Sequence, residues 1–179
     1  MNQCELVLNK SWLIVIMLVS CSPSQKDIYE ICRNGSYAEM QLLHEQSPNQ
    51  IDVPNSNGYT PLVLASYHNN SEVVSFLLEK GANINVNSGF GTPLMAAVVK
   101  NHHDIVEQLL QSKADVNLSD ESGTTALHYS TMFKNTNTIQ MLLDAGADIH
   151  SLDAQNYSPL DYAVMYNDSK LIALLNSSL

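Results

Sequence analysis

The sequence predicts an all-α solenoid, in which short helical units stack along one axis. A motif of Thr or Ser, then Pro or Ala, then Leu occurs four times, and its leucines are 32, 33 and 33 residues apart: Leu62, Leu94, Leu127 and Leu160. Self-similarity at a fixed period of this size is typical of stacked-repeat proteins. A polar turn and a second apolar segment follow each copy, which indicates a unit of helix, turn, helix and loop.

The residues of one unit predict its elements in order. We expect the first helix to begin at the Thr or Ser of the motif, because the hydroxyl caps unpaired amides and Pro gives up a donor that had no partner. Gly81 and Gly146 are expected to end the second helix in the left-handed conformation, which Gly adopts without strain. A loop closes each unit, and hydrogen bonding within the loops explains the recurring polar residues Asn83, Asn85, Asp115, Asn117 and Asp148.

Three motifs together resemble the ankyrin repeat family: Thr-Pro-Leu, Ile/Val-Val-x-x-Leu-Leu and Gly-Ala-Asn/Asp-Ile/Val-Asn. The resemblance implies repeats at about 55–86, 87–119, 120–152 and 153–179, with a degenerate first repeat at 27–54. Lys113 stands where the family has its helix-ending Gly, and Phe90 and Asn156 stand where it has the hairpin Gly. Ala126 replaces Pro. We expect Lys113 to be mildly strained, because a left-handed backbone favours Gly or Asn.

The two ends of the stack are expected to be atypical, because one face of a terminal repeat meets water. Polar Asn176-Ser177-Ser178 follows Leu175, so the last repeat is predicted to cap the stack. In the degenerate repeat, the residues predicted to line the two helices are Ile28, Ile31 and Cys32, and then Met40, Leu42 and Leu43.

Residues 1–20 are predicted to be a lipoprotein signal peptide. Lys10 precedes the apolar run 12–19, which is shorter than the about 20 residues that span a bilayer. Leu18-Val19-Ser20-Cys21 resembles the lipobox of bacterial lipoproteins, which implies cleavage before Cys21 and a lipid on that cysteine. The alternatives are a generic signal peptide and a buried N-terminal helix.

Residues 21–26 are then the lipidated cysteine and a short tether. Ser22 after the cysteine resembles lipoproteins exported to the outer membrane, which implies a chain anchored in the cell outer membrane and facing the periplasm. With Cys4 removed and Cys21 lipidated, Cys32 is left as one free thiol, which excludes an internal disulfide. Cys32 lies in an apolar helical stripe, so we expect a core residue.

The chain is strongly acidic, with 8 Lys and Arg against 18 Asp and Glu and a net charge of −10. Such a surface repels nucleic acid and anionic lipid head groups, so we expect no nucleic acid, and membrane contact only through the lipid on Cys21. The charge either steers the chain towards a basic protein partner or serves solubility alone. We expect the free chain to be a monomer.

The resemblance to ankyrin repeats also implies a concave protein-binding surface, formed by hairpin tips and the exposed side of each first helix. Aromatic and Met residues are enriched there, and such residues anchor interfaces. The residues that we predict to bind a protein are Asn57, Tyr59, Tyr67, His68, Phe90, Lys100, Glu121, Phe133, Tyr157 and Tyr166. Their neighbours on this surface are Ser56, Ser88, Val99, Ser122, Thr124, Met132, Gln155 and Met165, of which Val99 and Met132 have packing between repeats as an alternative.

The sequence holds no catalytic pattern: no Gly-x-Ser-x-Gly, no Gly-rich phosphate loop and no Cys pair at zinc spacing. The resemblance implies that His128 bonds back to Thr125 and to the neighbouring loop. His102-His103-Asp104 are adjacent residues that point apart, which disfavours a metal site. We therefore predict a non-enzymatic protein without metal or cofactor, the alternative being an activity within 27–54.

These observations predict a lipoprotein whose concave surface binds one periplasmic protein and blocks it. A short acidic lipoprotein of this build resembles immunity proteins that protect bacteria from secreted antibacterial effectors, including phospholipases of type VI secretion systems. The class of toxin rests on analogy alone. The alternative is a periplasmic scaffold, similar to exported ankyrin proteins that support envelope enzymes under stress without inhibiting them.

Overall fold

A computed structural model describes residues 26–88 and 91–177, and over these residues the chain is all-helical, with ten α-helices, one 3-10 helix and no β-strand beyond two isolated bridges. The elements are α1 Ile28–Asn34, α2 Tyr37–Gln46, η1 Pro48–Gln50, α3 Pro61–Tyr67, α4 Ser71–Glu79, α5 Pro93–Val99, α6 His103–Gln111, α7 Ala126–Met132, α8 Thr136–Asp144, α9 Pro159–Met165 and α10 Ser169–Asn176. The predicted signal peptide, Cys21 and Phe90 lie outside the described residues.

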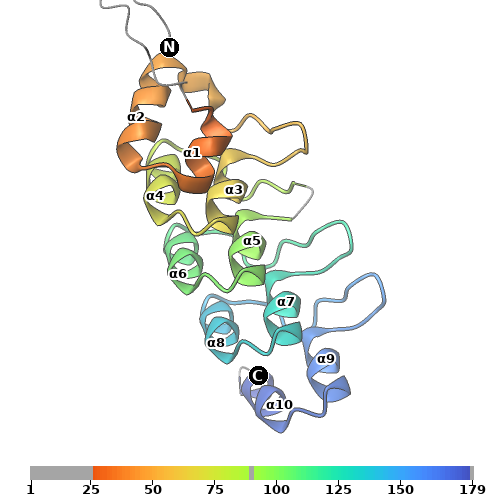
Figure 1. Cartoon of the computed structure of the whole chain (residues 1–179). Coiled ribbons are helices and arrows are strands. Elements are labelled where there is room, and N and C mark those ends of the chain that lie inside the picture. Colours follow the sequence, from red (N-terminus) through yellow and green to blue (C-terminus); the bar gives the residue numbers. More distant parts are fainter. Residues whose placement is uncertain (1–25, 89–90, 178–179) are drawn as a thin grey trace, which may run out of the picture.

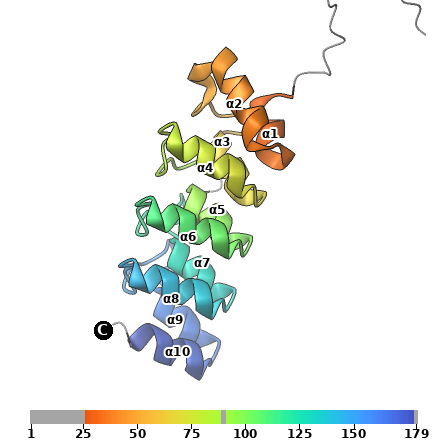
Figure 2. The ribbon, with the colours of Figure 1, turned by 90° about the vertical axis from the view of Figure 1, so that its left-hand side faces the viewer.

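The helices form two columns that run the length of the molecule. In Figure 1 the odd-numbered helices make one column, the even-numbered helices make the other, and the loops project from the odd-numbered side. Figure 2 shows the even-numbered column from its exposed side. Each first helix packs on the first helices of the neighbouring units, from α1 through α3, α5 and α7 to α9. The predicted all-α solenoid is confirmed.

The first helices begin where the sequence predicts, but one predicted cap is wrong. Pro61, Pro93 and Pro159 occupy the first helical position, and the hydroxyls of Thr92, Thr125 and Ser158 each accept a hydrogen bond from an amide in the first turn. The Thr60 side chain makes no such bond, and its buried Oγ1 has no hydrogen-bond partner among the described residues. At α3, therefore, Pro61 and tertiary packing define the helix start without help from the hydroxyl.

The predicted left-handed positions are confirmed. Gly81 and Gly146 have φ of 80° and 87°, and Lys113 adopts the same conformation with φ of 67°. Asn156 has φ of 61° in its hairpin, which Asn tolerates better than most residues. The turns between the two helices of a repeat also use this region, at Asn69, Asn101, Lys134 and Asn167.

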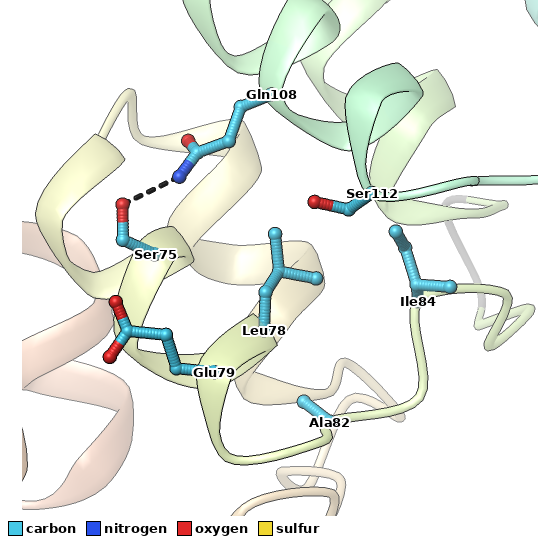
Figure 3. A pocket seen from close by; sticks show the side chains of 7 residues that line it. All are labelled: Ser75, Leu78, Glu79, Ala82, Ile84, Gln108 and Ser112. Atoms are coloured by element: carbon cyan, nitrogen blue, oxygen red, sulfur yellow. Dashed lines mark hydrogen bonds between the residues drawn. The ribbon is translucent and has the colours of Figure 1, made fainter.

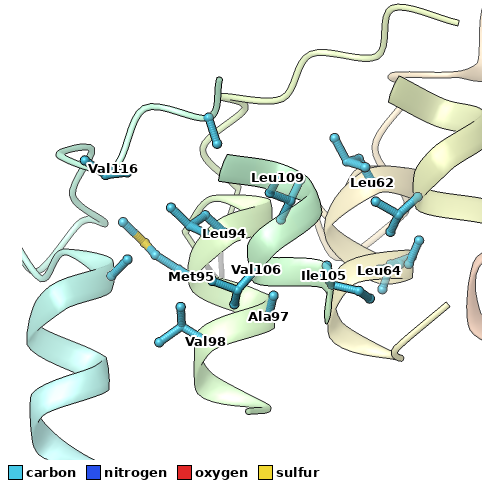
Figure 4. Close-up of a cluster of buried hydrophobic side chains, with 14 of the residues drawn as sticks. Leu62, Leu64, Leu94, Met95, Ala97, Val98, Ile105, Val106, Leu109 and Val116 are labelled. Carbon is cyan, nitrogen blue, oxygen red and sulfur yellow. The ribbon is translucent and has the colours of Figure 1, made fainter. Parts of the chain in front are cut away.

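A continuous apolar core runs through all the repeats. Leu62, Leu94 and Leu127 of the repeated motif are buried in this core. The second helices also contribute to it, for example through Leu109 of α6, which Figure 4 shows beside Leu94. Cys32 is fully buried as predicted, and this burial, followed by the negative charge of Asp27, raises the pKa of its thiol above the ordinary value. A raised pKa disfavours the reactive thiolate.

The loops are joined to one another by a ladder of side-chain hydrogen bonds. Asp52 accepts from the Asn83 amide, Asn85 from the Asp115 amide and Asn117 from the Asp148 amide, at 2.8–3.0 Å. Within single loops, Asn83, Asp115 and Asp148 accept from the amide two residues on. The predicted loop hydrogen bonding is confirmed. The hydrogen bonds between loops also connect each loop to the next one along the stack.

The first repeat corrects the sequence analysis at one residue. Leu42 was expected in the core but is 58% exposed, whereas Met40 and Leu43 are buried. Leu42 aligns with Phe76, which is buried against the rings of Tyr37 and His44 in the preceding repeat. No described repeat precedes Leu42, so its position lies open to solvent.

The last repeat is only partly capped. Asp161 is an exposed, polar residue at the position where Val63, Met95 and His128 are buried in the preceding repeats. Val164, however, is 56% exposed, although its equivalent in the preceding repeat, Thr131, is fully buried. Asn176 and Ser177 are exposed after buried Leu175, as expected of a capping repeat, whereas Val164 is an exposed apolar side chain in the last repeat.

Candidate functional site

The predicted binding residues fall into two groups that share the odd-numbered side of the fold. Asn57, Tyr59, Glu121 and Tyr157 lie in the projecting loops, and Tyr67, His68, Lys100, Phe133 and Tyr166 lie at the C-terminal ends of α3, α5, α7 and α9. We call these two groups the recognition surface. Tyr59 and Tyr67 are half-buried, and the other seven residues are exposed.

In the last repeat, ring contacts join the loop to the helix end. Tyr157 of the loop packs against Tyr162 at a centroid distance of 5.8 Å, and Tyr162 packs against Tyr166 at 6.4 Å. Tyr162 and Tyr166 are four residues apart and so share one face of the helix. The two groups of predicted residues are thus parts of one continuous surface here. We call Tyr157, Tyr162 and Tyr166 the aromatic cluster.

Tyr129 and Tyr162 belong to this surface and were missed by sequence reasoning. Each donates its hydroxyl to an aspartate at the base of its own loop: Tyr129 to Asp120 at 2.6 Å and Tyr162 to Asp153 at 2.5 Å. The signal was present, because both tyrosines stand four residues before a predicted binding residue, Phe133 or Tyr166. The two aspartates also accept backbone amides of their loops, so each tyrosine ties a helix to a hairpin.

These hydrogen bonds shift the pKa values of the groups that make them. Burial and then the Asp120 hydrogen bond raise the pKa of Tyr129 to about 12, and the Asp153 hydrogen bond followed by burial raises the pKa of Tyr162 to about 12. Burial alone would raise the pKa of Asp153, but hydrogen bonds from Tyr162 and from two backbone amides lower it overall. At neutral pH the tyrosines are donors and Asp153 is a charged acceptor.

Exposed large apolar side chains concentrate in the last two repeats. Phe133 is 58% exposed and Tyr166 41%, and Tyr157, Met165 and Val164 are exposed as well. In the second repeat, by contrast, the Tyr67 ring is half-covered and the Lys100 ammonium lies 4.8 Å from its centroid. The apolar part of the recognition surface is therefore at the C-terminal end of the stack.

His128 has the structural role that the resemblance implied. Its Nδ1 accepts the Thr125 amide at 3.2 Å, and its Nε2 lies 3.0 Å from the Tyr157 carbonyl oxygen in the next loop. A carbonyl oxygen accepts only, so the proton is assigned to Nε2. Both ring nitrogens are occupied and the side chain is fully buried, which leaves His128 no access to a substrate.

The adjacent histidines face different neighbours, as expected. His102 Nε2 lies 3.1 Å from the Tyr67 carbonyl oxygen in the preceding repeat, whereas His103 Nδ1 lies 3.2 Å from the Thr138 hydroxyl in the following one. Across 26–88 and 91–177, no group of three or more His, Cys, Asp or Glu side chains is placed to hold a metal ion. In the same part of the chain, no helix has the length and apolar character needed to cross a membrane.

An open hollow of about 430 Å³ lies between α4 and α6, in the even-numbered column (Figure 3). Its apolar lining residues are Leu78, Ala82 and Ile84, and two of its polar lining residues are joined by a 2.6 Å hydrogen bond from Gln108 to Ser75. Its carboxylate, Glu79, accepts the Tyr37 hydroxyl at 2.7 Å. The hollow therefore contains no arrangement of acid, base and nucleophile.

Comparison with known families agrees with this architecture. A family model described as ankyrin repeats in three copies matches residues 13–88 and 94–178 of the chain. A search of curated proteins finds no match. The chain belongs to the ankyrin-repeat family, whose stacked repeats are modules for protein–protein interaction and are typically scaffolds without enzymatic activity.

Proposed function

We propose that this chain is a lipid-anchored protein-binding module of the cell envelope, which binds a periplasmic protein and neutralises it. The observation that carries the proposal is the exposed aromatic surface of the last two repeats, formed by Phe133 and the aromatic cluster. Exposed rings bury a large area at low entropic cost, and interface hot spots are enriched in them. The hydrogen bonds of Tyr129 and Tyr162 to their loops favour binding further, because they order the surface before the partner arrives.

The envelope location rests on residues 1–26, which resemble a lipoprotein signal with a lipid on Cys21. Residues 22–26 could extend by roughly 17 Å between the lipid and the first helix. This short tether would hold the recognition surface close to the membrane. An inhibitor placed there would meet an enzyme that attacks the lipid bilayer, which is the reason for proposing an immunity function against a secreted effector such as a phospholipase.

We further propose that the partner is basic overall and is bound by a free monomer without enzymatic activity. The net charge of −10 would speed the encounter with a basic protein through long-range attraction. A scaffold for an envelope enzyme would use the same surface, and the two functions differ in what the partner does once it is bound.

The test is capture of partners from the cell envelope by the full chain carrying an affinity tag. The variant replaces Phe133, Tyr157 and Tyr166 by Ala. The matched control replaces Leu42 and Val53 by Ala, because these are exposed apolar side chains in the first repeat. We expect one stoichiometric protein to be captured by the wild type and the control and lost from the variant.

The captured protein is then expressed alone and together with the chain. Toxicity that the chain suppresses supports the immunity function, whereas an active enzyme that the chain leaves uninhibited supports the scaffold. If the wild type captures no stoichiometric partner, or if the variant captures it as well as the control does, the proposed binding function is wrong. Replacing Cys21 by Ala tests the anchor separately, with loss of membrane fractionation as the expected result.

A further inference from the structure

Four basic side chains lie at or next to the C-terminal end of the first helix, one in each of four successive repeats. Arg33 lies in the last turn of α1, His68 and Lys100 cap the C-terminal ends of α3 and α5, and Lys134 directly follows the cap of α7. We call these residues the basic row. The whole chain has only 8 Lys and Arg and a net charge of −10, yet three of them stand in this row. The basic row is therefore a positively charged feature of an otherwise acidic molecule.

The members of the row are near enough to affect one another. Burial lowers the pKa of His68, and the positive charges of Arg33, Lys100 and His102 lower it further. An open hollow lies between the first and second repeats and is lined by both Arg33 and His68. The row thus forms a strip across the first two junctions between repeats, and Lys134 stands next to the corresponding helix end of the following repeat.

Carboxylates of the protein neutralise this strip only in part. In the described portion of the chain, Arg33 and Lys100 form no ion pair, and Lys134 lies 3.9 Å from Asp168. Asp168 also caps α10 by accepting two amides. The two glutamates that line the hollow are occupied as well, because Glu39 pairs with Lys26 and Glu72 accepts the Tyr37 amide. Further carboxylates on these elements are Glu30, three residues before Arg33 in α1, and Asp104 in the first turn of α6.

Two of the cations are held in place by aromatic rings. The Lys100 ammonium lies over Tyr67, and the Lys134 ammonium lies 5.1 Å from the centroid of Tyr166. A cation over a ring keeps its charge while its side chain loses freedom. Because these side chains are already ordered, less entropy is lost when an anion binds them. The two lysines lie in different repeats, so a ligand that contacts both must be extended and carry repeated negative charges.

We propose that the basic row binds an acidic, extended segment of the partner protein that lies along the stack across the repeat junctions. The proposal rests on the protein-binding function above and adds an orientation: the acidic segment meets the basic row, and the aromatic cluster receives an apolar part of the same partner. Charge complementarity of this kind selects partners and fixes how they dock. An anionic bilayer is the less favoured ligand, because the net charge of −10 repels it.

The test uses the full chain in neutral detergent micelles and a labelled peptide that alternates Glu with Ser. The row variant combines Arg33→Gln, Lys100→Gln and Lys134→Gln. The matched control combines Lys80→Gln, Lys113→Gln and Lys170→Gln, which removes the same charge from outside the row. We expect the row variant to bind the peptide about tenfold more weakly than the control, with binding that weakens as salt rises. Circular dichroism checks that both variants remain folded.

A peptide with Gln in place of Glu should not bind, and vesicles containing anionic phosphatidylglycerol should bind no better than neutral ones. Equal weakening in the two variants, no binding of the acidic peptide by the wild type, or preferential binding of the anionic vesicles would overturn the proposal. Envelope capture separates it from the proposed function. If the row variant captures the partner as well as the control does, while the aromatic variant loses it, the binding function stands and the basic row is not its contact.

Discussion

The hydroxyl of Tyr129 donates a 2.6 Å hydrogen bond to Oδ2 of Asp120, nine residues earlier in the chain. The same relationship recurs one repeat later between Tyr162 and Asp153. In the second repeat, Asn55 accepts the loop amides at the position of Asp120, but Leu64 stands where the tyrosine would be. The link between helix and loop is thus found in the two repeats that carry the exposed aromatic surface.

Replacing Tyr129 by Phe should lower the free energy of unfolding by about 1 kcal/mol, because a hydrogen bond to a charged acceptor is lost at a half-buried site. Urea unfolding measures the change. Asp120→Asn is the companion variant, because Asn55 at the equivalent position accepts the amides of its own loop through its side-chain oxygen. In a double-mutant cycle we expect a favourable coupling between the two changes. Strictly additive effects would mean that the hydrogen bond contributes nothing.

The two tyrosines should also make stability depend on alkaline pH. Their pKa values are about 12 in the folded chain against an ordinary value of 10.0, so the folded chain holds the protons more tightly. The stabilisation is therefore complete below pH 10.0 and is lost as pH rises from there through about 12. Melting temperatures across this interval measure the loss, and the double variant Tyr129→Phe, Tyr162→Phe should lose less. An equal loss in both proteins would assign the effect to other groups.

The sequence predicted the repeat because the period, the helix starts and the glycines depend on contacts that are local or identical in each unit. Leu42 was misplaced for a different reason. In an internal repeat its position is covered by the preceding unit, as Phe76 shows, and the sequence of one repeat does not tell whether that unit exists.

The binding surface was expected at the hairpin tips and the exposed sides of the first helices, because the resemblance to ankyrin repeats implies it. Tyr129 and Tyr162 were missed because their equivalents, Leu64 and Ala96, are buried. From the sequence alone, a tyrosine at this position is predicted to be a buried core residue. Only the structure shows that its hydroxyl donates a hydrogen bond to the loop. The basic row was hidden for a related reason, since its members are a repeat apart in sequence and are brought into one strip only by stacking.

Lys113→Gly should stabilise the protein by about 0.5–1 kcal/mol, because Lys113 has φ of 67° and Gly populates that region without strain. The melting temperature measures the gain. Gly146→Lys is the reciprocal change at φ of 87° and should lower the melting temperature by a similar amount. A lower melting temperature for Lys113→Gly would contradict the left-handed conformation at this site.

Leu109→Ala should destabilise the protein by roughly 2–5 kcal/mol, because the side chain is fully buried between repeats and its loss leaves a cavity. Leu42→Ala removes the same atoms from an exposed position and should change stability by less than about 0.5 kcal/mol. Chemical denaturation of both variants compares a position inside the stack with one at its open end. Similar losses would place a covering element over Leu42.

His128→Met should loosen the last repeat and leave the first repeats unchanged. Met95 fills the equivalent position in the third repeat, so the variant keeps a buried side chain of suitable shape while it removes the hydrogen bonds to Thr125 and Tyr157. The variant removes the contact to the Tyr157 carbonyl oxygen, which still accepts the Asp153 amide, so we expect a cost of about 1 kcal/mol.

Hydrogen exchange measures this effect repeat by repeat. We expect faster exchange over residues 153–177 and unchanged exchange around Leu62 and Leu94. Repeat proteins are stabilised by nearest-neighbour contacts, so a local change need not spread along the stack. Because the aromatic cluster lies in the loosened repeat, the variant should also bind the captured partner more weakly, although His128 itself is buried and cannot touch that partner. Uniformly faster exchange would show instead that the stack unfolds as one unit.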